Sequence, residues 1–266
     1  MELTIYQVDA FASNPFEGNP AGVCITDTPL SEELMRLIAK EMAVSETVFL
    51  SRTDMNLRWF TPEIEVNLCG HGTLSVAHIL KEIGEAKIGD IITFNTLSGS
   101  LSAKVAQGEI ELNFPTAKVS PKQPLDLSLF NALGLQQQHI KSVSEFDSKV
   151  LIEVIDEEFV RGLSPDFSAL INQPGRGVVV TSLANDEHLD FVSRYFAPWV
   201  GVNEDPVTGS NHCALSRFWG ERLGKTALKA YQASNRGGYI KMQLLPNNRT
   251  MLIGSAVTVI KGVMHV

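Results

Sequence analysis

The stretch Arg58-Trp59-Phe60-Thr61-Pro62-Glu63-Ile64-Glu65-Val66-Asn67 returns later in the chain as Arg194-Tyr195-Phe196-Ala197-Pro198-Trp199-Val200-Gly201-Val202-Asn203. Five of the ten positions are identical and a sixth exchanges one aromatic residue for another, whereas average residue usage gives roughly one identity by chance. The two copies lie 136 residues apart, about half of the 266-residue chain. The sequence therefore predicts two copies of one structural unit.

An apolar window of helical length follows each copy. The first opens with Cys69-Gly70-His71-Gly72-Thr73 and ends at Gly84, and the second opens with Asp205-Pro206-Val207-Thr208-Gly209-Ser210 and ends at Gly224. Their apolar residues cover most of the helix circumference, which is typical of buried helices. Alternating segments such as 109–114 predict strands around them. We therefore expect an α+β fold in which each half curls a sheet around its helix.

The composition excludes several classes of protein. With 44% hydrophobic and 20% charged residues, the chain is globular. A net charge of -8 and the absence of a Lys/Arg run disfavour nucleic acids and anionic membranes as partners. No window approaches the ~20 apolar residues of a membrane span, and the first residues do not form a signal peptide, so we expect a cytoplasmic protein. The three cysteines form no CxxC pair, which argues against disulfides and a thiolate zinc site.

Two similar units side by side predict a cleft with the glycine-containing loops as its lining. The start of a helix offers unpaired N–H groups and a partial positive charge, so both loops are suited to bind a carboxylate. An ungapped comparison sets Leu68-Cys69 of the first half against Glu204-Asp205 of the second. The site is therefore expected to be asymmetric, without a matched pair of thiols.

Glu46 is the best candidate for a proton-transfer group. It lies in Ser45-Glu46-Thr47-Val48-Phe49, where a helix passes into a strand, and its apolar neighbours are expected to raise its pKa by burial. A solvated surface glutamate is the alternative interpretation. His71 and His78 share a helical face, but no acidic ligand stands at HExxH spacing, so we expect no metal site. Nucleotide-binding patterns are also absent, and no cofactor is expected.

Together, four motifs closely resemble the phenazine-biosynthesis-like PhzF family and follow its order from residue 7 to about 224. These motifs are Asp9-Ala10-Phe11 with Gly18-Asn19-Pro20-Ala21-Gly22-Val23, then Ser45-Glu46-Thr47-Val48-Phe49, then Cys69-Gly70-His71-Gly72-Thr73, then Glu204-Asp205-Pro206-Val207-Thr208-Gly209-Ser210. The resemblance implies the diaminopimelate-epimerase-like fold, with two pseudo-symmetric repeats, each a mixed, barrel-like sheet around a central helix.

The expected domains are residues 1–117 and 118–255, with a proline-rich linker at 116–124 between the repeats. The family resemblance implies that the carboxy-terminal strand, about 256–266, crosses back onto the first domain. It also implies a homodimer.

The resemblance further implies a cofactor-independent isomerase that moves a proton on a small carboxylate-bearing substrate. Glu46 matches the family's acid/base glutamate. The positions that match substrate-binding residues are Asn19, His71, Gly72, Thr73, Asp205, Gly209 and Ser210.

Other functions stay open at this point. Cys69 matches one catalytic thiol of diaminopimelate epimerase, so a racemase or epimerase that uses Glu46 or Cys69 as one of two bases is an alternative. A small-molecule binding protein without turnover is another, and a metal-dependent hydrolase is a third. The substrate follows from pocket shape rather than motifs, so phenazine chemistry itself is not implied.

Overall fold

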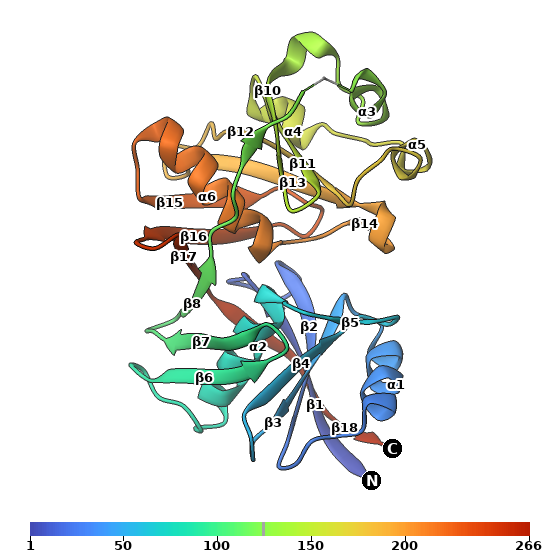
Figure 1. Ribbon diagram of the computed structural model, residues 1–266. Helices are drawn as coiled ribbons and strands as arrows, with labels where there is room; N and C mark the ends of the chain where they lie inside the picture. Colours follow the sequence, from blue (N-terminus) through green and yellow to red (C-terminus); the bar gives the residue numbers. More distant parts are fainter. Residues whose placement is uncertain (124–125) are drawn as a thin grey trace. The chain divides into compact units, whose positions relative to one another are not determined.

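The computed structural model describes residues 1–123 and 126–266, so Pro124 at the end of the expected linker lies outside the described residues (Figure 1). The chain divides into two compact units. Unit 1 comprises Met1–Phe114 and Met251–Val266, and unit 2 comprises Pro115–Thr250. The expected boundaries at 117/118 and 255/256 lie a few residues from this division.

Unit 1 contains two helices and most of the strands of the first repeat, joined by the carboxy-terminal strand. Its elements are β1 (Glu2–Ala10), β2 (Asn19–Thr26), α1 (Glu32–Met42), β3 (Glu46–Ser51), β4 (Asn56–Phe60), β5 (Glu65–Val66), α2 (Gly70–Glu82), β6 (Ile91–Thr96), β7 (Gly99–Val105), β8 (Ile110–Pro115), the end of β17 (Arg249–Gly254), and β18 (Ala256–His265).

Unit 2 contains the second repeat. Its elements are β9 (Ser120–Pro121), α3 (Leu127–Ala132), the 3-10 turn η1 (Gln137–His139), β10 (Ile140–Phe146), β11 (Lys149–Val154), α4 (Glu157–Arg161), α5 (Phe167–Ile171), β12 (Val178–Leu183), β13 (Phe191–Ala197), the 3-10 turn η2 (Pro198–Val200), β14 (Val202–Glu204), α6 (Gly209–Leu223), β15 (Ala227–Gln232) and β16 (Gly238–Leu245).

The two units pair their strands in the same way. In unit 1, β1–β2 is antiparallel, β2–β3 parallel, β3–β4 antiparallel, β4–β6 parallel and β6–β7 antiparallel. In unit 2 the same sequence of senses runs through β10–β11, β11–β12, β12–β13, β13–β15 and β15–β16. The outer strand is also matched, because β18 pairs antiparallel with β1 as β9 does with β10. This agreement confirms the predicted α+β fold of two similar mixed sheets.

The recurrent sequence stretch forms the same clamp in both units. Arg58 donates to Glu65 with N···O distances of 2.5 and 2.6 Å, and its guanidinium lies 5.0 Å from the centroid of the Phe60 ring. Arg194 donates to Glu204 at 2.7 and 2.9 Å and lies 4.9 Å from the Phe196 ring. In both units the arginine therefore ties the short strand that precedes the central helix to its neighbour.

This clamp corrects the ungapped comparison of the two halves. Phe60 pairs with Glu65, whereas Phe196 pairs with Glu204, three residues further along. The additional residues fall in the turn that contains η2 (Pro198–Val200). The Val-Asn identity at the end of the repeated stretch therefore joins residues that do not occupy equivalent positions in the two units. Glu204 is therefore the counterpart of Glu65, and not of Leu68.

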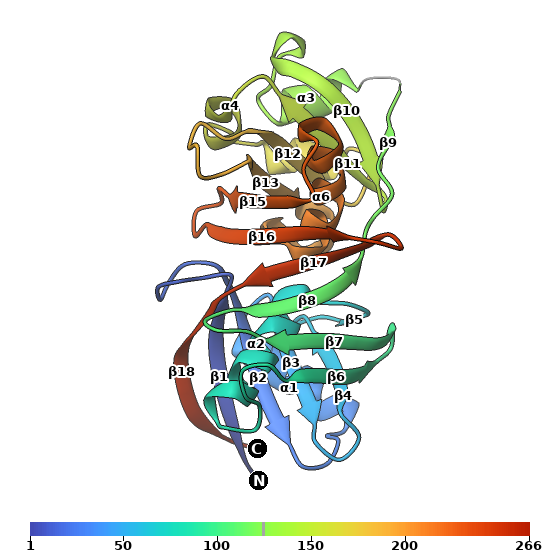
Figure 2. The same ribbon diagram turned by 90° about the vertical axis from the view of Figure 1, so that its left-hand side faces the viewer.

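The central helices α2 and α6 are buried on most sides, as their sequences predict. In α2, nine of the thirteen residues are buried, and the helix packs against β1, β2, β3, β7 and β18 (Figure 2). In α6, Trp219 lies between the rings of Phe191 and Phe218, and its indole donates to Thr181. Gly224 ends the helix with φ of 65°, a left-handed conformation that glycine adopts without a steric penalty.

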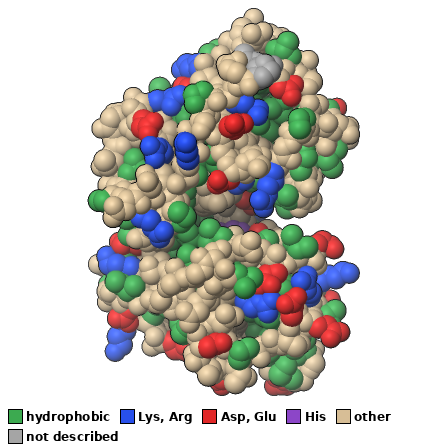
Figure 3. Space-filling model, in the orientation of Figure 1, with side chains coloured by type: hydrophobic (Ala, Val, Ile, Leu, Met, Phe, Trp, Pro, Cys, Tyr) green, Lys and Arg blue, Asp and Glu red, His purple; other side chains and the backbone are tan. Residues whose placement is uncertain are grey.

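Among the described residues, no helix is long and apolar enough to cross a membrane. On the face shown in Figure 3, acidic and basic side chains are interspersed rather than gathered into a single patch. The surface thus agrees with the mixed charge pattern of the sequence.

Candidate functional site

Three elements of unit 1 begin at the same place. The parallel pairing of β2 and β3 sets Ala21 opposite Glu46, so Asn19 at the start of β2 and Ser45 before β3 lie at one end of the sheet. Contacts with His71, in the first turn of α2, join the helix start to this end. The fold thus gathers residues from three separate motifs.

His71 is the centre of this cluster. Its Nε2 lies 3.2 Å from Oε2 of Glu46 and 3.3 Å from Oγ of Ser45. Its Nδ1 lies 3.4 Å from Nδ2 of Asn19 and 3.5 Å from Sγ of Cys69. Glu46 has a side-chain exposure of 20%, against 7% for His71. The Glu46 side chain is therefore more accessible to solvent than the imidazole that it contacts.

The hydrogen bonds orient the imidazole. Because an amide nitrogen only donates, Nδ2 of Asn19 can bond only to a neutral ring, in which Nδ1 of His71 accepts and Nε2, which faces Glu46, carries the proton. Ser45 donates to Oδ1 of Asn19 at 3.1 Å and so holds that amide in place. A second proton on Nδ1 would find the sulphur of Cys69 as its acceptor. Asn19 and Ser45 therefore position the imidazole that contacts Glu46.

The sequence-based expectation of a raised pKa for Glu46 is wrong. Burial does act to raise the pKa of Glu46, but the charge and hydrogen bond of His71, with a further bond from Ser45, hold it below its usual value. Burial acts to lower the pKa of His71, but the charge of Glu46 and the hydrogen bonds to Cys69 and Glu46 raise it well above 6.5. The two groups thus stabilise a carboxylate and an imidazolium together.

We expect Glu46→Gln to lower the pKa of His71, because the substitution removes the carboxylate and leaves the opposing effect of burial. The His71 imidazolium stabilises the wild-type fold below the unfolded-state pKa of about 6.5, and this contribution is lost as pH rises through its higher folded-state pKa. NMR titration of the His71 ring measures the change. Glu82→Gln, which removes the carboxylate 3.4 Å from His78, is the control and leaves His71 unchanged. Equal His71 titrations in wild type and Glu46→Gln would contradict the pairing.

The first turn of α2 uses two of the N–H groups that were expected to be free. The amide of Gly72 donates to Sγ of Cys69 at 3.3 Å, and the amide of Thr73 donates to the Cys69 carbonyl at 3.1 Å. In the described structure the amides of Gly70 and His71 have no acceptor. An anion at this helix start would therefore meet Gly70 and His71, two residues earlier than predicted.

Gly72 has a packing role that the motif alone did not show. A β-carbon at this position would lie 2.5 Å from Cγ2 of Val48 and 3.0 Å from Cδ1 of Trp59. The absence of a side chain lets the helix start approach β3 and β4 closely. This close approach brings His71 to Glu46.

In unit 2, the loop before α6 is held by a network around Asp205. Thr208 donates its hydroxyl to the Asp205 carboxylate. The Gln232 side chain accepts from the Thr208 amide at 2.9 Å and donates to the Asp205 carbonyl at 2.7 Å. The backbone amides of Gly209 and Ser210 have no acceptor among residues 1–123 and 126–266. Gln232 lies in β15, far from every motif, so sequence analysis missed it.

Strand register shows which residue of unit 2 corresponds to each member of the His71 cluster in unit 1. Cys69 and Thr208 occupy the same position, directly before α2 and α6. Thr47 pairs with Phe60 as Val178 pairs with Phe196, so the counterpart of Glu46 is Gly177. The carboxylate of the first repeat therefore has no equivalent in the second, and neither does its thiol.

Glu46, Cys69 and His71 also present their ligand atoms within 4.8 Å of one another, a grouping that the sequence did not predict. Burial raises the pKa of Cys69, so metal binding must first remove a proton from a stable thiol. We therefore still expect elemental analysis to find no stoichiometric metal, and hydrogen exchange of the substrate to survive dialysis against a chelator. One tightly held zinc per chain, with loss of exchange on its removal, would overturn this prediction.

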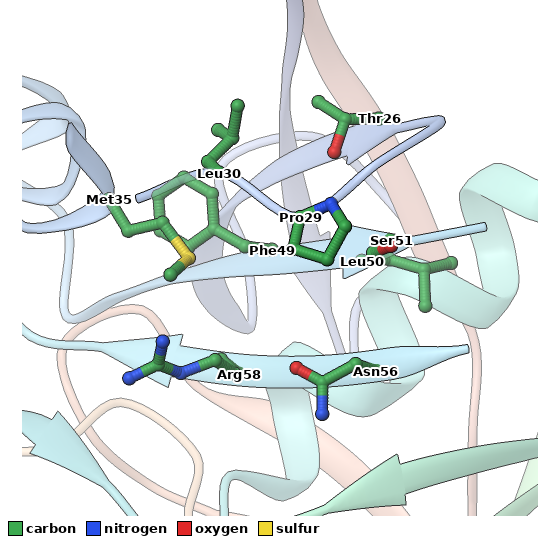
Figure 4. A pocket seen from close by; sticks show the side chains of 9 residues that line it. All are labelled: Thr26, Pro29, Leu30, Met35, Phe49, Leu50, Ser51, Asn56 and Arg58. Carbon is green, nitrogen blue, oxygen red and sulfur yellow. The ribbon is translucent and has the colours of Figure 1, made fainter. Parts of the chain in front are cut away.

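A small pocket of about 50 Å³ lies elsewhere in unit 1 and contains none of the predicted site residues (Figure 4). Its apolar part comes from the segment before α1, from α1 and from β3, and its polar part from β2, β3 and β4. The lining residues are Thr26, Pro29, Leu30, Met35, Phe49, Leu50, Ser51, Asn56 and Arg58. This volume can hold water but is far below the several hundred Å³ typical of small-molecule sites.

Comparisons with known proteins agree with the motifs and the fold. Residues 8–262 match the family described as phenazine biosynthesis-like protein, PhzC-PhzF. An uncharacterized isomerase of Halalkalibacterium halodurans is 44% identical over 264 residues, which cover 98% of each chain. The crystal structure of a PhzF-family phenazine biosynthesis protein from Enterococcus faecalis has a TM-score of 0.92 at 38% identity over the full length of both chains.

A predicted epimerase from Pseudomonas aeruginosa has a TM-score of 0.76 at 19% identity and covers 99% of both chains, which shows a shared fold. With its two repeats and the cluster at the start of α2, the chain is a mixed α+β protein of the epimerase-like fold. It belongs to the PhzC-PhzF, phenazine biosynthesis-like, family.

Proposed function

We propose that the protein is a cofactor-independent isomerase that moves a proton between carbon atoms of a small carboxylate-bearing substrate, with Glu46 as acid and base. The observation that carries the proposal is the contact of 3.2 Å between Glu46 and His71 at the open end of β3. A carboxylate held in this way is ionised, partly exposed and fixed in direction. It can take a proton from carbon and return it at a second carbon.

His71 stabilises each state of this cycle. While Glu46 is ionised, the imidazolium offsets its charge, and after Glu46 has taken the substrate proton the imidazolium keeps its own proton and stays bonded to the carboxyl group. Ser45 accepts from Nε2 and keeps the ring in place throughout, because Nε2 carries a proton in both states of the ring. The relatives named as isomerases support the reaction class.

Binding of the substrate carboxylate is assigned to helix starts. Gly70 and His71 have free amides in α2, and Gly209 and Ser210 have them in α6. Asp205, with its carboxylate bonded to Thr208, is proposed to orient a polar substituent. Roles for Gly72 and Thr73 in binding rest on the family resemblance, because their amides already have acceptors.

A racemase with two thiol bases is the less favoured function. Such an enzyme needs a second thiol opposite Cys69, and Thr208 holds that position. An epimerase with Glu46 as one base stays within the isomerase class and differs in its product. From the family we also propose that the protein is a homodimer and a cytoplasmic, biosynthetic enzyme.

The test is incubation of the protein with a panel of small carboxylates in deuterated water. Mass spectrometry detects uptake of deuterium, and chromatography separates a shifted double bond from an inverted centre. A panel that includes cyclic and unsaturated acids and α-amino acids covers both outcomes. Binding of a panel member without any exchange of hydrogen would favour a non-catalytic binding protein.

A further inference from the structure

Lys149, the first residue of β11, reaches the start of α6. Its Nζ donates to Oδ1 of Asn211 at 2.7 Å and to Oγ of Ser210 at 3.4 Å. The ammonium also lies 5.2 Å from the ring centroid of Tyr195 and 5.4 Å from that of Phe146. Aromatic faces and neutral oxygens thus surround a cation at a helix amino terminus.

Within the described chain, no carboxylate lies within ion-pair distance of this ammonium. Burial lowers the pKa of Lys149 to about 8. The carboxylates of Asp147 and Asp205 act from a distance to raise this pKa, and the charge of Arg176 acts to lower it further. A cation that is only partly compensated gains stability from an anion placed beside it. Among the described residues, Lys149 therefore has no anionic group at ion-pair distance.

A second polar group at the same place also lacks a partner. Because Lys149 can only donate, it fixes Asn211 with Oδ1 towards the ammonium, and the amide nitrogen Nδ2 is then left buried without an acceptor. Asn211 is 1% exposed and stands in the first turn of α6. A buried donor without an acceptor costs free energy, and an anion at this place would supply an acceptor. The free amides of Gly209 and Ser210 belong to the same turn.

Lys149 contacts the start of its central helix from a different strand than Glu46 does. In unit 1, Glu46 at the start of β3 contacts His71, the second residue of α2. In unit 2, Lys149 at the start of β11 contacts Ser210, the second residue of α6. Strand register makes Ala21 the counterpart of Lys149, so the lysine is a feature of unit 2 alone and unit 1 has no cation at this place.

We infer that Lys149, Ser210 and the first turn of α6 form a binding site for a carboxylate, in which the lysine supplies the charge and the helix amides supply directed donors. This assignment rests on the proposed function for its carboxylate-bearing substrate, but its chemistry does not depend on Glu46. It adds a cation to a site for which the sequence indicated only backbone and hydroxyl groups.

The test uses acetate as the probe and needs no knowledge of the substrate. NMR follows the amides of Gly209 and Ser210 and the ε-carbon of Lys149 while acetate replaces chloride at constant ionic strength. We expect saturable shifts, and roughly tenfold weaker acetate binding in Lys149→Gln because a charge-assisted bond is lost. Lys229, exposed in β15, is the control and is expected to show no saturable shift.

Several results would overturn the assignment. These are equal effects of acetate and chloride, unchanged acetate affinity in Lys149→Gln, or saturable binding of sulfate or phosphate without binding of acetate. Lys149→Arg, which keeps the charge, shows whether any loss reflects charge or a disturbed fold, since it retains binding only in the first case. Glu46→Gln binds acetate at this site like the wild type, so failure of the anion site and failure of the Glu46 mechanism are separate outcomes.

Discussion

Glu46→Gln abolishes the exchange of substrate hydrogen with deuterated water and leaves substrate binding largely intact. Glutamine has nearly the same shape as glutamate, and its carbonyl oxygen can accept the hydrogen bond from His71, but it cannot take a proton at neutral pH. A positioned acid/base contributes about 10²–10⁴-fold in rate, and the exchange rate is expected to fall by that factor. The measurement is deuterium uptake by mass spectrometry on the carboxylate identified in the panel, with affinity measured separately by calorimetry.

Cys69→Ala is the matched control, because Cys69 lies in the same cluster, 3.5 Å from Nδ1 of His71. Its thiol caps α2 by accepting from Gly72, so its removal weakens the helix start by about 1 kcal/mol. Substantial exchange activity is expected to remain. The reverse ranking, with an inactive Cys69→Ala and an active Glu46→Gln, would assign the chemistry to the thiol and to an epimerase mechanism.

Trp219→Ala is expected to have the largest effect on stability, about 3–5 kcal/mol in the free energy of unfolding. The indole is 1% exposed, its ring centroid lies 5.8 Å from that of Phe191 and 5.3 Å from that of Phe218, and its Nε1 donates to Thr181 at 3.0 Å. Alanine would leave a cavity between α6 and the sheet that the neighbouring rings cannot close. Urea unfolding followed by circular dichroism measures the change.

Ile171→Ala is the control for this measurement, because Ile171 is 53% exposed at the end of α5 and its truncation creates no cavity. Its effect is expected to stay within about 0.5 kcal/mol. Trp219→Phe keeps the ring stacking and is expected to lie between the two. A Trp219→Ala protein as stable as Ile171→Ala would mean that α6 is not the centre of the core of unit 2.

Sequence patterns gave the fold class because they report burial and periodicity. The repeated stretch and the two apolar helical windows predicted two similar halves, and the matched strand pairing confirms the two-repeat fold. The patterns did not give the register of the second copy. Three extra residues around η2 are compatible with the same apolar pattern, and only the Arg194–Glu204 pair shows where the equivalence resumes.

The family resemblance singled out residues of the candidate site, and the structure decided how they act on one another. Glu46 was expected to have a raised pKa because neighbouring residues in the sequence are apolar, but the group that governs it is His71, 25 residues away. Gly72 and Thr73 were expected to offer free amides, but the Cys69 side chain and carbonyl take them. Side-chain contacts between distant segments cannot be read from local sequence.

The sequence by itself determined that the chain has two similar α+β halves, that each half has a buried central helix, and that the motifs belong to one family. These properties follow from apolar periodicity and residue identity, which are local or repeated along the chain. Only the tertiary structure decided the charge state of Glu46, the free amides at the helix starts and the placement of Lys149 against Ser210. Those properties depend on which atoms come within hydrogen-bond distance after the sheet has closed on its helix, and electrostatic interactions in a buried site are strong only over such distances.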